Sequence, residues 1–400
     1  MTGIIKTFAF IYALLIPVLP APVLGQQMAP TNVPNPVLAH LQASLKTYTN
    51  DDGRTGLFQC PAGMDASFAK MWTEFATADL NLLVGQTESL IISAKVQSKN
   101  EEMDAIIARL SRTKSHIVAL QKAAADLTCE CPVWATFRPD MTVVQERHLT
   151  NEARCEFACL VRAILAQFST ALVEARSSQE RLQAKQQQAL AEIAQLRSEL
   201  AAQKEQLDAS RSSREDFLAS LYQEINDERK CSQTAAFCRA RLLSALREAS
   251  GTCDRTYGGL SRRLPAPVAS PPADAPKRRE PPLRIALGSE LDVEPLSPVL
   301  AVGDGEVLLA ECAPGFGLTV VLSHGASEMT VFSHLAAALV RPGARVKVGQ
   351  QIAFSGQSGL TQHPSLLFAL LKDGRFKDPR PRIDWPSCRK EPPAPQRSKP

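Results

Sequence analysis

The hydrophobic pattern of this 400-residue chain divides it into a helical part and a β part. Between residues 65 and 127, apolar residues such as Ile106 and Leu110 recur at spacings of three and four, which predicts amphipathic helix. Residues 299–378 instead hold short runs of Val, Leu and Ile separated by Gly or Pro-Gly, which is typical of strands joined by tight turns. The expected fold is therefore multidomain, with an all-α coiled-coil or helical-hairpin region followed by a small all-β domain.

The helical part ends in a segment of residues 145–250 that contains no proline or glycine. A heptad repeat runs through it for about seven heptads and predicts a coiled-coil seam. Glutamines interrupt this seam, so we expect a flexible or intramolecular coil. The seam residues are Val161, Leu165, Phe168, Leu172, Ala175, Gln179, Leu182, Gln186, Ala189, Ile193, Leu196, Leu200, Gln203 and Leu207.

Two capping signals indicate where the helices begin and end. Ser98 followed by Glu101 has the capping-box spacing, so residues 65–127 form either two helices or one kinked helix. Ser213 followed by Asp216 predicts that the coil folds back there into a last helix. We interpret the whole region as antiparallel helices.

The first residues indicate an exported protein, and the charge balance does not indicate a nucleic-acid partner. Lys plus Arg number 45 against 41 for Asp plus Glu, and the net charge of +4 is too small to indicate a nucleic-acid partner. Residues 1–25 combine Lys6, an apolar run from Phe8 to Leu19 and small residues before Gln26, which predicts a secretory signal peptide. An uncleaved anchor is the alternative, although the apolar run is short for a membrane span.

Ten cysteines in an exported chain favour disulfides over metal sites. Cys155 and Cys159 lie four residues apart on one helix face, and a helical hairpin would bring them to Cys129 and Cys131. We predict two disulfides there, with a four-cysteine zinc site as the alternative. Further disulfide candidates, whose pairing the sequence leaves open, are Cys231 and Cys238, with Cys60 and Cys253 among their possible partners.

The β segment carries five short motifs in a fixed order. They read Val-Leu-Ala-Val-Gly-Asp-Gly-Glu-Val from residue 299, Gly-Phe-Gly-Leu-Thr-Val-Val-Leu-Ser-His-Gly from 315, Val-Phe-Ser-His-Leu from 331, Val-Arg-Pro-Gly-Ala-Arg-Val-Lys-Val-Gly-Gln-Gln-Ile from 340 and Ser-Gly-Gln-Ser-Gly from 355. Together they resemble the LytM (lysostaphin-type) peptidase domain, a zinc-dependent hydrolase of peptidoglycan cross-links, over roughly residues 284–386.

The chain departs from that family at the metal ligands. The resemblance implies a zinc ion held by His-x-x-x-Asp and by the second His of His-x-His. Asp292 aligns with the Asp, which leaves Gly288 at the first His, and Ser-Leu-Leu at residues 365–367 replaces His-x-His. A catalytic zinc needs about three protein ligands, so we expect no metal, no cofactor and no catalytic residue. His334 matches the assisting His of the family, and a shifted alignment would return one imidazole through His363.

The order of signal peptide, coiled coil, linker and degenerate LytM domain is similar to the EnvC-type murein hydrolase activators of Gram-negative bacteria. This resemblance implies a non-catalytic periplasmic protein that activates peptidoglycan amidases and is recruited to the division or envelope machinery through its coiled coil. A non-catalytic peptidoglycan-binding or structural envelope protein is the alternative, and an active metallopeptidase is a third reading. The groove expected to bind the partner is lined by Asp292, Phe332, His334, Gln362, His363 and Ser365.

The domain boundaries follow from these patterns. A proline-rich linker is expected to let the helical and β parts move independently. The predicted segments are a signal peptide at 1–25, a flexible lead-in at 26–63 with a short helix near 37–45, a helical region with disulfides at 64–253, the linker at 254–283, the degenerate LytM-like domain at 284–388 and a disordered tail at 389–400.

Overall fold

The computed structural model describes residues 36–49, 57–129, 151–250, 257–268 and 288–384. The side chains of residues 36, 49, 126–129, 151–162 and 250 lie outside this description, as do the predicted signal peptide and tail. Within the described part of the chain, no helix combines the length and the hydropathy that a bilayer-spanning segment needs.

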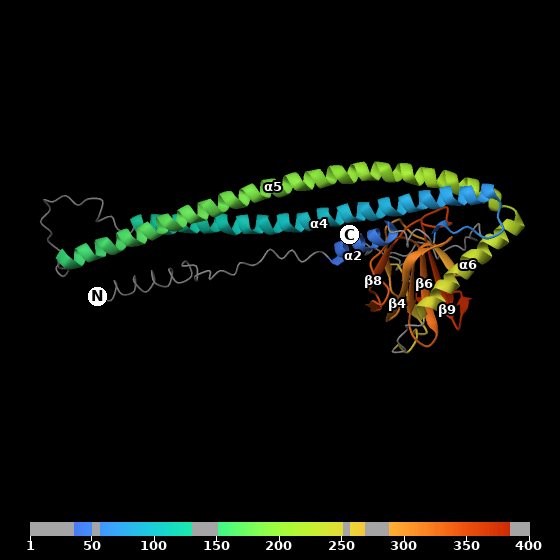
Figure 1. Ribbon diagram of the computed structural model, residues 1–400. Coiled ribbons are helices and arrows are strands. Elements are labelled where there is room, and N and C mark those ends of the chain that lie inside the picture. Colours follow the sequence, from blue (N-terminus) through green and yellow to red (C-terminus); the bar gives the residue numbers. More distant parts are fainter. Residues whose placement is uncertain (1–35, 50–56, 130–150, 251–256, 269–287, 385–400) are drawn as a thin grey trace, which may run out of the picture. The chain divides into compact units, whose positions relative to one another are not determined.

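The long helices of the described part are α4 (Ala66–Cys129) and α5 (Asn151–Ile225), which lie side by side (Figure 1). They are antiparallel, because contacts farther along α4 meet positions earlier in α5. Two shorter helices, α2 (Pro36–Thr49) and α6 (Glu228–Ser250), precede and follow this pair. The successive contacts between α4 and α5 join Asp79 to Arg214, Glu88 to Gln203, and Lys99 to Glu192.

The predicted coiled-coil seam is found between α4 and α5. The seam residues Leu182, Ala189 and Ile193 form one buried cluster with apolar residues of α4 such as Met103 and Leu110. The coil is therefore intramolecular, which was one of the two expectations. α4 is a single continuous helix across the Ser98 capping signal.

The predicted fold-back at Ser213 is wrong. α5 continues to Ile225, and the chain turns at Asn226–Asp227, where the Asp227 carboxylate accepts a hydrogen bond of 2.9 Å from Arg229 N. The reason is tertiary packing. Arg214 and Leu218 are buried, and helical backbone through this stretch is required to present both to the interior, which overrides the local capping signal.

The β domain is one antiparallel sheet of nine strands with the order β10-β9-β6-β5-β4-β7, extended by β2 on β9, by β8 on β6 and by β3 on β8. The predicted fold class, a helical region followed by a β domain, is confirmed. The strands are β2 (Ser289–Asp292), β3 (Pro298–Leu300), β4 (Gly305–Ala313), β5 (Gly317–Ser323), β6 (Glu328–Ala338), β7 (Arg345–Val346), β8 (Gln351–Ser355), β9 (Ser365–Lys372) and β10 (Arg375–Lys377).

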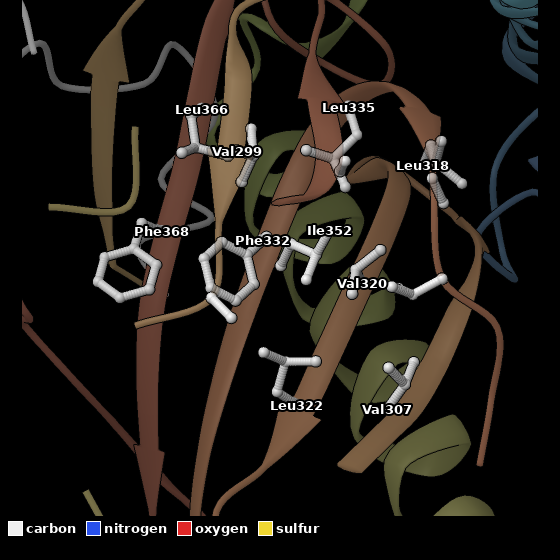
Figure 2. Close-up of a cluster of buried hydrophobic side chains, with 14 of the residues drawn as sticks. Val299, Val307, Leu318, Val320, Leu322, Phe332, Leu335, Ile352, Leu366 and Phe368 are labelled. Atoms are coloured by element: carbon white, nitrogen blue, oxygen red, sulfur yellow. The ribbon is translucent and has the colours of Figure 1, made fainter. Parts of the chain in front are cut away.

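Alternate residues of the central strands face two different cores. Val320, Phe332 and Phe368 belong to the core within the β domain, where the two phenyl rings lie 5.1 Å apart (Figure 2). The neighbouring residues Val321 and Leu367 belong instead to a second buried cluster that includes apolar side chains of α4, α5 and α6. Helices therefore cover one face of the sheet.

Part of the predicted linker belongs to the β domain. Leu264–Pro265 (β1) pairs in parallel with Ile383–Asp384 (β11), and Val268 forms a bridge to Val299. The apolar side chain of Leu264 is buried and belongs to the hydrophobic core of the β domain. Residues 269–287 lie outside the described residues.

The predicted lead-in also contributes to the fold. The short helix expected near residues 37–45 is present as α2, and its Ser44 Oγ donates a 2.7 Å hydrogen bond to Ala338 O at the end of β6. Tyr48 is buried in the β core beside it. The helices and the β domain thus share buried clusters and hydrogen bonds. The two parts are packed against each other in this structure, and their independent movement stays a prediction.

Candidate functional site

The pairing of β2 with β9 places Glu290 directly opposite Leu367, and Asp292 opposite Ser365. Glu290 Oε1 accepts a 2.8 Å hydrogen bond from Ser365 Oγ, and Thr361 Oγ1 lies 2.9 Å from the same oxygen. Leu367 stands where the resemblance places the second His of His-x-His. The carboxylate that faces this position is therefore that of Glu290.

The predicted assignment of Asp292 and Gly288 to the family's Asp and first His is corrected by this geometry. A Cβ atom at Gly288 would lie 2.2 Å from Phe368 O and 2.6 Å from Ala369 Cβ, so the fold leaves no room there for any side chain. Glu290 takes the carboxylate position, and the family spacing then puts Ala286, which lies outside the described residues, at the first His.

The residues at the expected metal position do not fit a catalytic zinc. Ser365 supplies a hydroxyl and Leu367 an apolar side chain where the family has nitrogen donors, which leaves the Glu290 carboxylate as the single charged donor. Within the described residues, no group of three or more His, Cys, Asp or Glu side chains is placed to hold a metal ion. Zinc prefers nitrogen, sulfur and carboxylate ligands in tetrahedral sets, so we derive no metal-dependent step.

His334 is buried beside Glu290 in an unusual backbone conformation, with φ of 64°. Its Nδ1 lies 2.7 Å from Ser358 O, and because a carbonyl oxygen only accepts, Nδ1 carries the proton. Burial lowers the pKa of His334, and the Glu290 carboxylate partly opposes this shift. His334 is therefore a neutral, fixed imidazole at neutral pH. We call Glu290, His334, Thr361 and Ser365 the Glu290 cluster.

Three helical residues reach the loop beside this cluster. Arg214 of α5 donates from Nη2 to Gly359 O and, at 3.1 Å, to Thr361 O. Asp79 of α4 accepts a 2.8 Å hydrogen bond from Gly359 N. Tyr222 of α5 donates from its hydroxyl to Leu360 O at 3.0 Å. Every residue of the 359–361 loop is thus hydrogen-bonded to a helix.

Asp79 and Arg214 also form a buried ion pair, with 2.6 Å between Oδ1 and Nε, and both side chains are at most 2% exposed. The guanidinium lies 5.5 Å from the centre of the Phe75 ring. Burial raises the pKa of Asp79, while the charge of Arg214 and the hydrogen bonds from Arg214 and Gly359 oppose the shift. Buried charges are tolerated when they are paired and hydrogen-bonded. Here the two charges pair with each other, and the 359–361 loop of the β domain supplies the further hydrogen bonds.

The predicted groove is only partly assembled. His334 and Ser365 both belong to the Glu290 cluster, but Phe332 is wholly buried on the opposite face of the sheet, so its assignment to the groove is wrong (Figure 2). Gln362 and His363 are exposed on the loop that follows Thr361. Gln362 also lines a cavity of about 670 Å³ together with Tyr222 and residues of α6.

Sequence reasoning missed Glu290, Thr361, Asp79 and Arg214. A signal for the last two existed. Asp79 lies four residues after Phe75 on the apolar face of its helix, and Arg214 lies seven residues after Leu207, at the next seam position. A charged residue at a position that the helical repeat reserves for apolar residues indicates a buried partner.

The described cysteines Cys60, Cys231, Cys238 and Cys312 carry free thiols. The suggested disulfides of Cys231 and Cys238 with Cys60 are therefore not formed in this structure. Cys238 is buried against the turn at Gly315, and a Cβ atom added to that glycine would lie 2.6 Å from the Sγ of Cys238. The thiol is therefore packed against the β domain. The side chains of the other candidates, Cys129, Cys131, Cys155, Cys159 and Cys253, lie outside the described residues.

Comparison with known proteins identifies the class of the β domain. Residues 284–379 match the model of Peptidase family M23. The chain therefore contains an M23-type (LytM) peptidase-family domain, which occupies about a quarter of its length.

Individual relatives match over the same region. The murein hydrolase activator EnvC of Escherichia coli (strain K12) is 41% identical over 83 residues, which are 21% of this chain and 20% of that protein. The peptidoglycan DD-endopeptidase ShyA of Vibrio cholerae is 39% identical over 79 residues, 20% of this chain and 18% of that protein. The lipoprotein NlpD/LppB homolog of Pseudomonas aeruginosa is 37% identical over 83 residues, 20% of this chain and 28% of that protein. The chain thus spans less than a third of the length of each relative, and its M23 domain is related both to an activator and to endopeptidases.

Proposed function

We propose that this protein is a non-catalytic periplasmic activator or adaptor of peptidoglycan amidases in cell-wall remodelling and division. The observation that carries the proposal is the replacement of the nitrogen donors by Ser365 and Leu367, with Leu367 packed into an apolar cluster with the helices. A site with a hydroxyl and an apolar side chain at these two positions is better suited to binding a partner than to metal-dependent hydrolysis. The similarity to a murein hydrolase activator supports the same reading.

The helices define how the β domain would meet a partner. Asp79, Arg214 and Tyr222 already occupy the hydrogen-bonding groups of the 359–361 loop. An amidase that binds this loop must therefore replace the hydrogen bonds that the helices make to it. Because a ligand shifts an equilibrium only by its preference for one state, division or envelope proteins that hold the α4–α5 hairpin away from the loop would increase activation.

The test is a reconstituted assay of amidase activity on purified peptidoglycan with the full chain. The chain alone is expected to release no peptidoglycan fragments, and to raise the rate of an added amidase. Arg214→Glu should activate more strongly than the wild type, because two carboxylates would then face each other and weaken the contact of the helices with the loop. Arg211→Glu, three residues earlier and outside this ion pair, is the matched control.

Two results would reject the proposal. Release of cross-linked peptides by the chain alone would indicate an endopeptidase. Absence of activation by the wild type and by both variants, combined with co-sedimentation of the chain with peptidoglycan, would favour a peptidoglycan-binding or structural envelope protein.

A further inference from the structure

We infer that the 359–361 loop is a guanidinium-binding site, and that a protein partner of this domain binds there through an arginine side chain. The inference rests on the proposed function for the presence of a partner, but the chemistry of the site is carried by the structure alone. Arg214 is the occupant that the chain itself supplies.

The loop presents two main-chain oxygens, those of Gly359 and Thr361, to one bound group. Gly359 O and Thr361 O both accept from Nη2 of Arg214, while Leu360 O accepts from the Tyr222 hydroxyl. Carbonyl oxygens only accept hydrogen bonds, so the groups that can satisfy them are donors. A donor that reaches two of these oxygens at once from a buried position is best supplied by a planar group with several N–H bonds.

The surroundings favour a cation over a neutral donor. The Glu290 carboxylate acts electrostatically on both His334 and Tyr222, and Asp79 pairs directly with the bound guanidinium. Gly359 N donates to Asp79, so the loop also has a group that orients a carboxylate beside the cation. The site therefore recognises an arginine accompanied by an acidic residue.

Arginine fits this arrangement better than lysine does. Nε of Arg214 points to Asp79 while Nη2 bridges Gly359 O and Thr361 O, which uses the fixed fork of a guanidinium. The Nη1 atom of Arg214 is buried and has no hydrogen-bond partner among the described residues. An ammonium group carries all of its donors on one nitrogen, so it lacks the separation between Nε and Nη2 that this arrangement uses.

Strands of the β domain hold this loop in addition to the helices. Gly359 has φ of 81°, and a Cβ there would lie 2.4 Å from Gly317 N. Ser358 Oγ donates to Leu335 O at 2.7 Å and accepts from Leu318 N at 2.9 Å. Strand β6 and the start of β5 thus fix the loop from below. A partner whose helix carries an arginine and a neighbouring carboxylate would find the hydrogen-bonding groups already arranged, once α4 and α5 have moved away from the loop.

The first experiment tests the site by chemical rescue, with the full chain. In Arg214→Ala, guanidinium chloride at about 10 mM should raise the melting temperature by about 2 °C or more relative to equal sodium chloride, because a ligand that binds only the folded state stabilises it. Urea at the same concentration should give no rise. The wild type and Arg211→Ala should show none with either. Arg214→Gln, which keeps more of the side-chain volume, replaces Arg214→Ala if the latter does not fold.

The second experiment tests the partner. With Arg214→Ala and an amidase, N-acetyl-arginine amide at millimolar concentration should reduce activation, whereas the neutral isostere N-acetyl-citrulline amide should not. Equal inhibition by both compounds, inhibition by neither, or a rise in melting temperature with guanidinium that is the same in the wild type would overturn the inference. The rescue requires no amidase, so a positive rescue without any activation would reject the proposed function and leave the guanidinium site standing.

Discussion

Arg214 of α5 and Gly359 of the β domain, 145 residues apart in the sequence, are joined by a hydrogen bond from the guanidinium group to the main-chain carbonyl. The same arginine pairs with Asp79 of α4, so one side chain connects both long helices to the sheet. Buried charges of this kind are costly when one partner is removed and cheap when both are replaced. This asymmetry gives the first prediction.

Asp79→Ala and Arg214→Ala should each lower the free energy of unfolding by about 3–5 kcal/mol, because each leaves the other charge buried and unpaired. The double variant Asp79→Leu/Arg214→Met should lose less than the sum of the two, since apolar side chains of similar size remove both charges. Chemical denaturation followed by circular dichroism measures these differences. Lys99→Ala, which breaks partly exposed ion pairs, should change the value by less than about 1 kcal/mol. Strict additivity in the double variant would contradict the pairing.

Phe332→Ala should act on stability rather than on partner binding. Phe332 is fully buried and packs against Phe368, so truncation should cost about 3–5 kcal/mol through lost burial and a cavity. Thermal melting of the full chain checks this, with His363→Ala as the control, because His363 is exposed. An unchanged melting temperature for Phe332→Ala would show that the ring is not in the core.

The β domain should hold no stoichiometric zinc, because Ser365 and Leu367 occupy the positions of nitrogen ligands. Elemental analysis of protein dialysed against zinc and then against buffer should give far less than one zinc per chain. About one zinc per chain, lost on changing Glu290 to Ala, would show that another donor set forms around this carboxylate.

Stability should fall as pH is lowered from 8 towards 5, partly because of His324 and His334. Burial lowers the pKa of both, so both are neutral in the folded chain at pH values at which unfolded histidine, with a pKa near 6.5, takes up a proton. Below about pH 6.5 the unfolded state therefore binds more protons, and the loss continues until the pH reaches the lowered folded pKa.

The variant that tests this pH dependence is His324→Gln. Nδ1 of His324 lies 2.8 Å from Asp304 O and Nε2 lies 2.8 Å from Thr330 Oγ1, so its ring is held at both nitrogens. The melting temperature of the variant should depend less steeply on pH between 7 and 5 than that of the wild type. His116→Gln, at an exposed position of α4, should keep the wild-type slope. An identical slope in all three proteins would exclude a contribution from His324.

The disulfides of Cys129 and Cys131 with Cys155 and Cys159 remain a prediction. Closing a loop of a few tens of residues should stabilise the chain by roughly 3 kcal/mol. Peptide mapping under non-reducing conditions, on protein exported to an oxidising compartment, should recover these cysteines in linked peptides. Recovery of all four as free thiols would reject the pairing, and reduction of the wild type that leaves its melting temperature unchanged would reject its stabilising effect.

The architecture could be predicted from the sequence because the spacing of apolar residues indicates which side chains are buried. Seam positions such as Phe168 and Leu182 are buried as the heptad requires, and the short apolar runs separated by glycine correctly indicated strands in residues 299–378. Helix ends were harder, since Ser213 has the local signature of a cap but lies beside Arg214, whose burial demands helix. The local capping signature of Ser213 and the tertiary packing of Arg214 favour different structures there. The packing prevails, and it involves residues that are distant in the sequence.

The candidate site was harder still to predict. Aligning Asp292 with the family's carboxylate fails by two residues, a shift that preserves which side of the strand each residue faces, so hydrophobic alternation could not reveal it. The pairing of Glu290 with Leu367 sets the register, and that pairing exists only across β2 and β9. The roles of Asp79 and Arg214 depend on the docking of helices on the sheet, which no spacing within one segment encodes.

The continuity of α4 has a mechanical consequence. Asp79 lies near the beginning of a helix that extends to Cys129, so at 1.5 Å per residue roughly 75 Å of rod continue beyond the ion pair. A force applied at the far tip acts on the Asp79 contact as a load at the end of a long arm acts on its pivot. A tilt of only about 2° would displace such a tip by roughly 2–3 Å, on the helix geometry alone. A small force at the tip therefore exerts a large torque about the Asp79 contact, where the hydrogen bonds to Arg214 and Gly359 resist it.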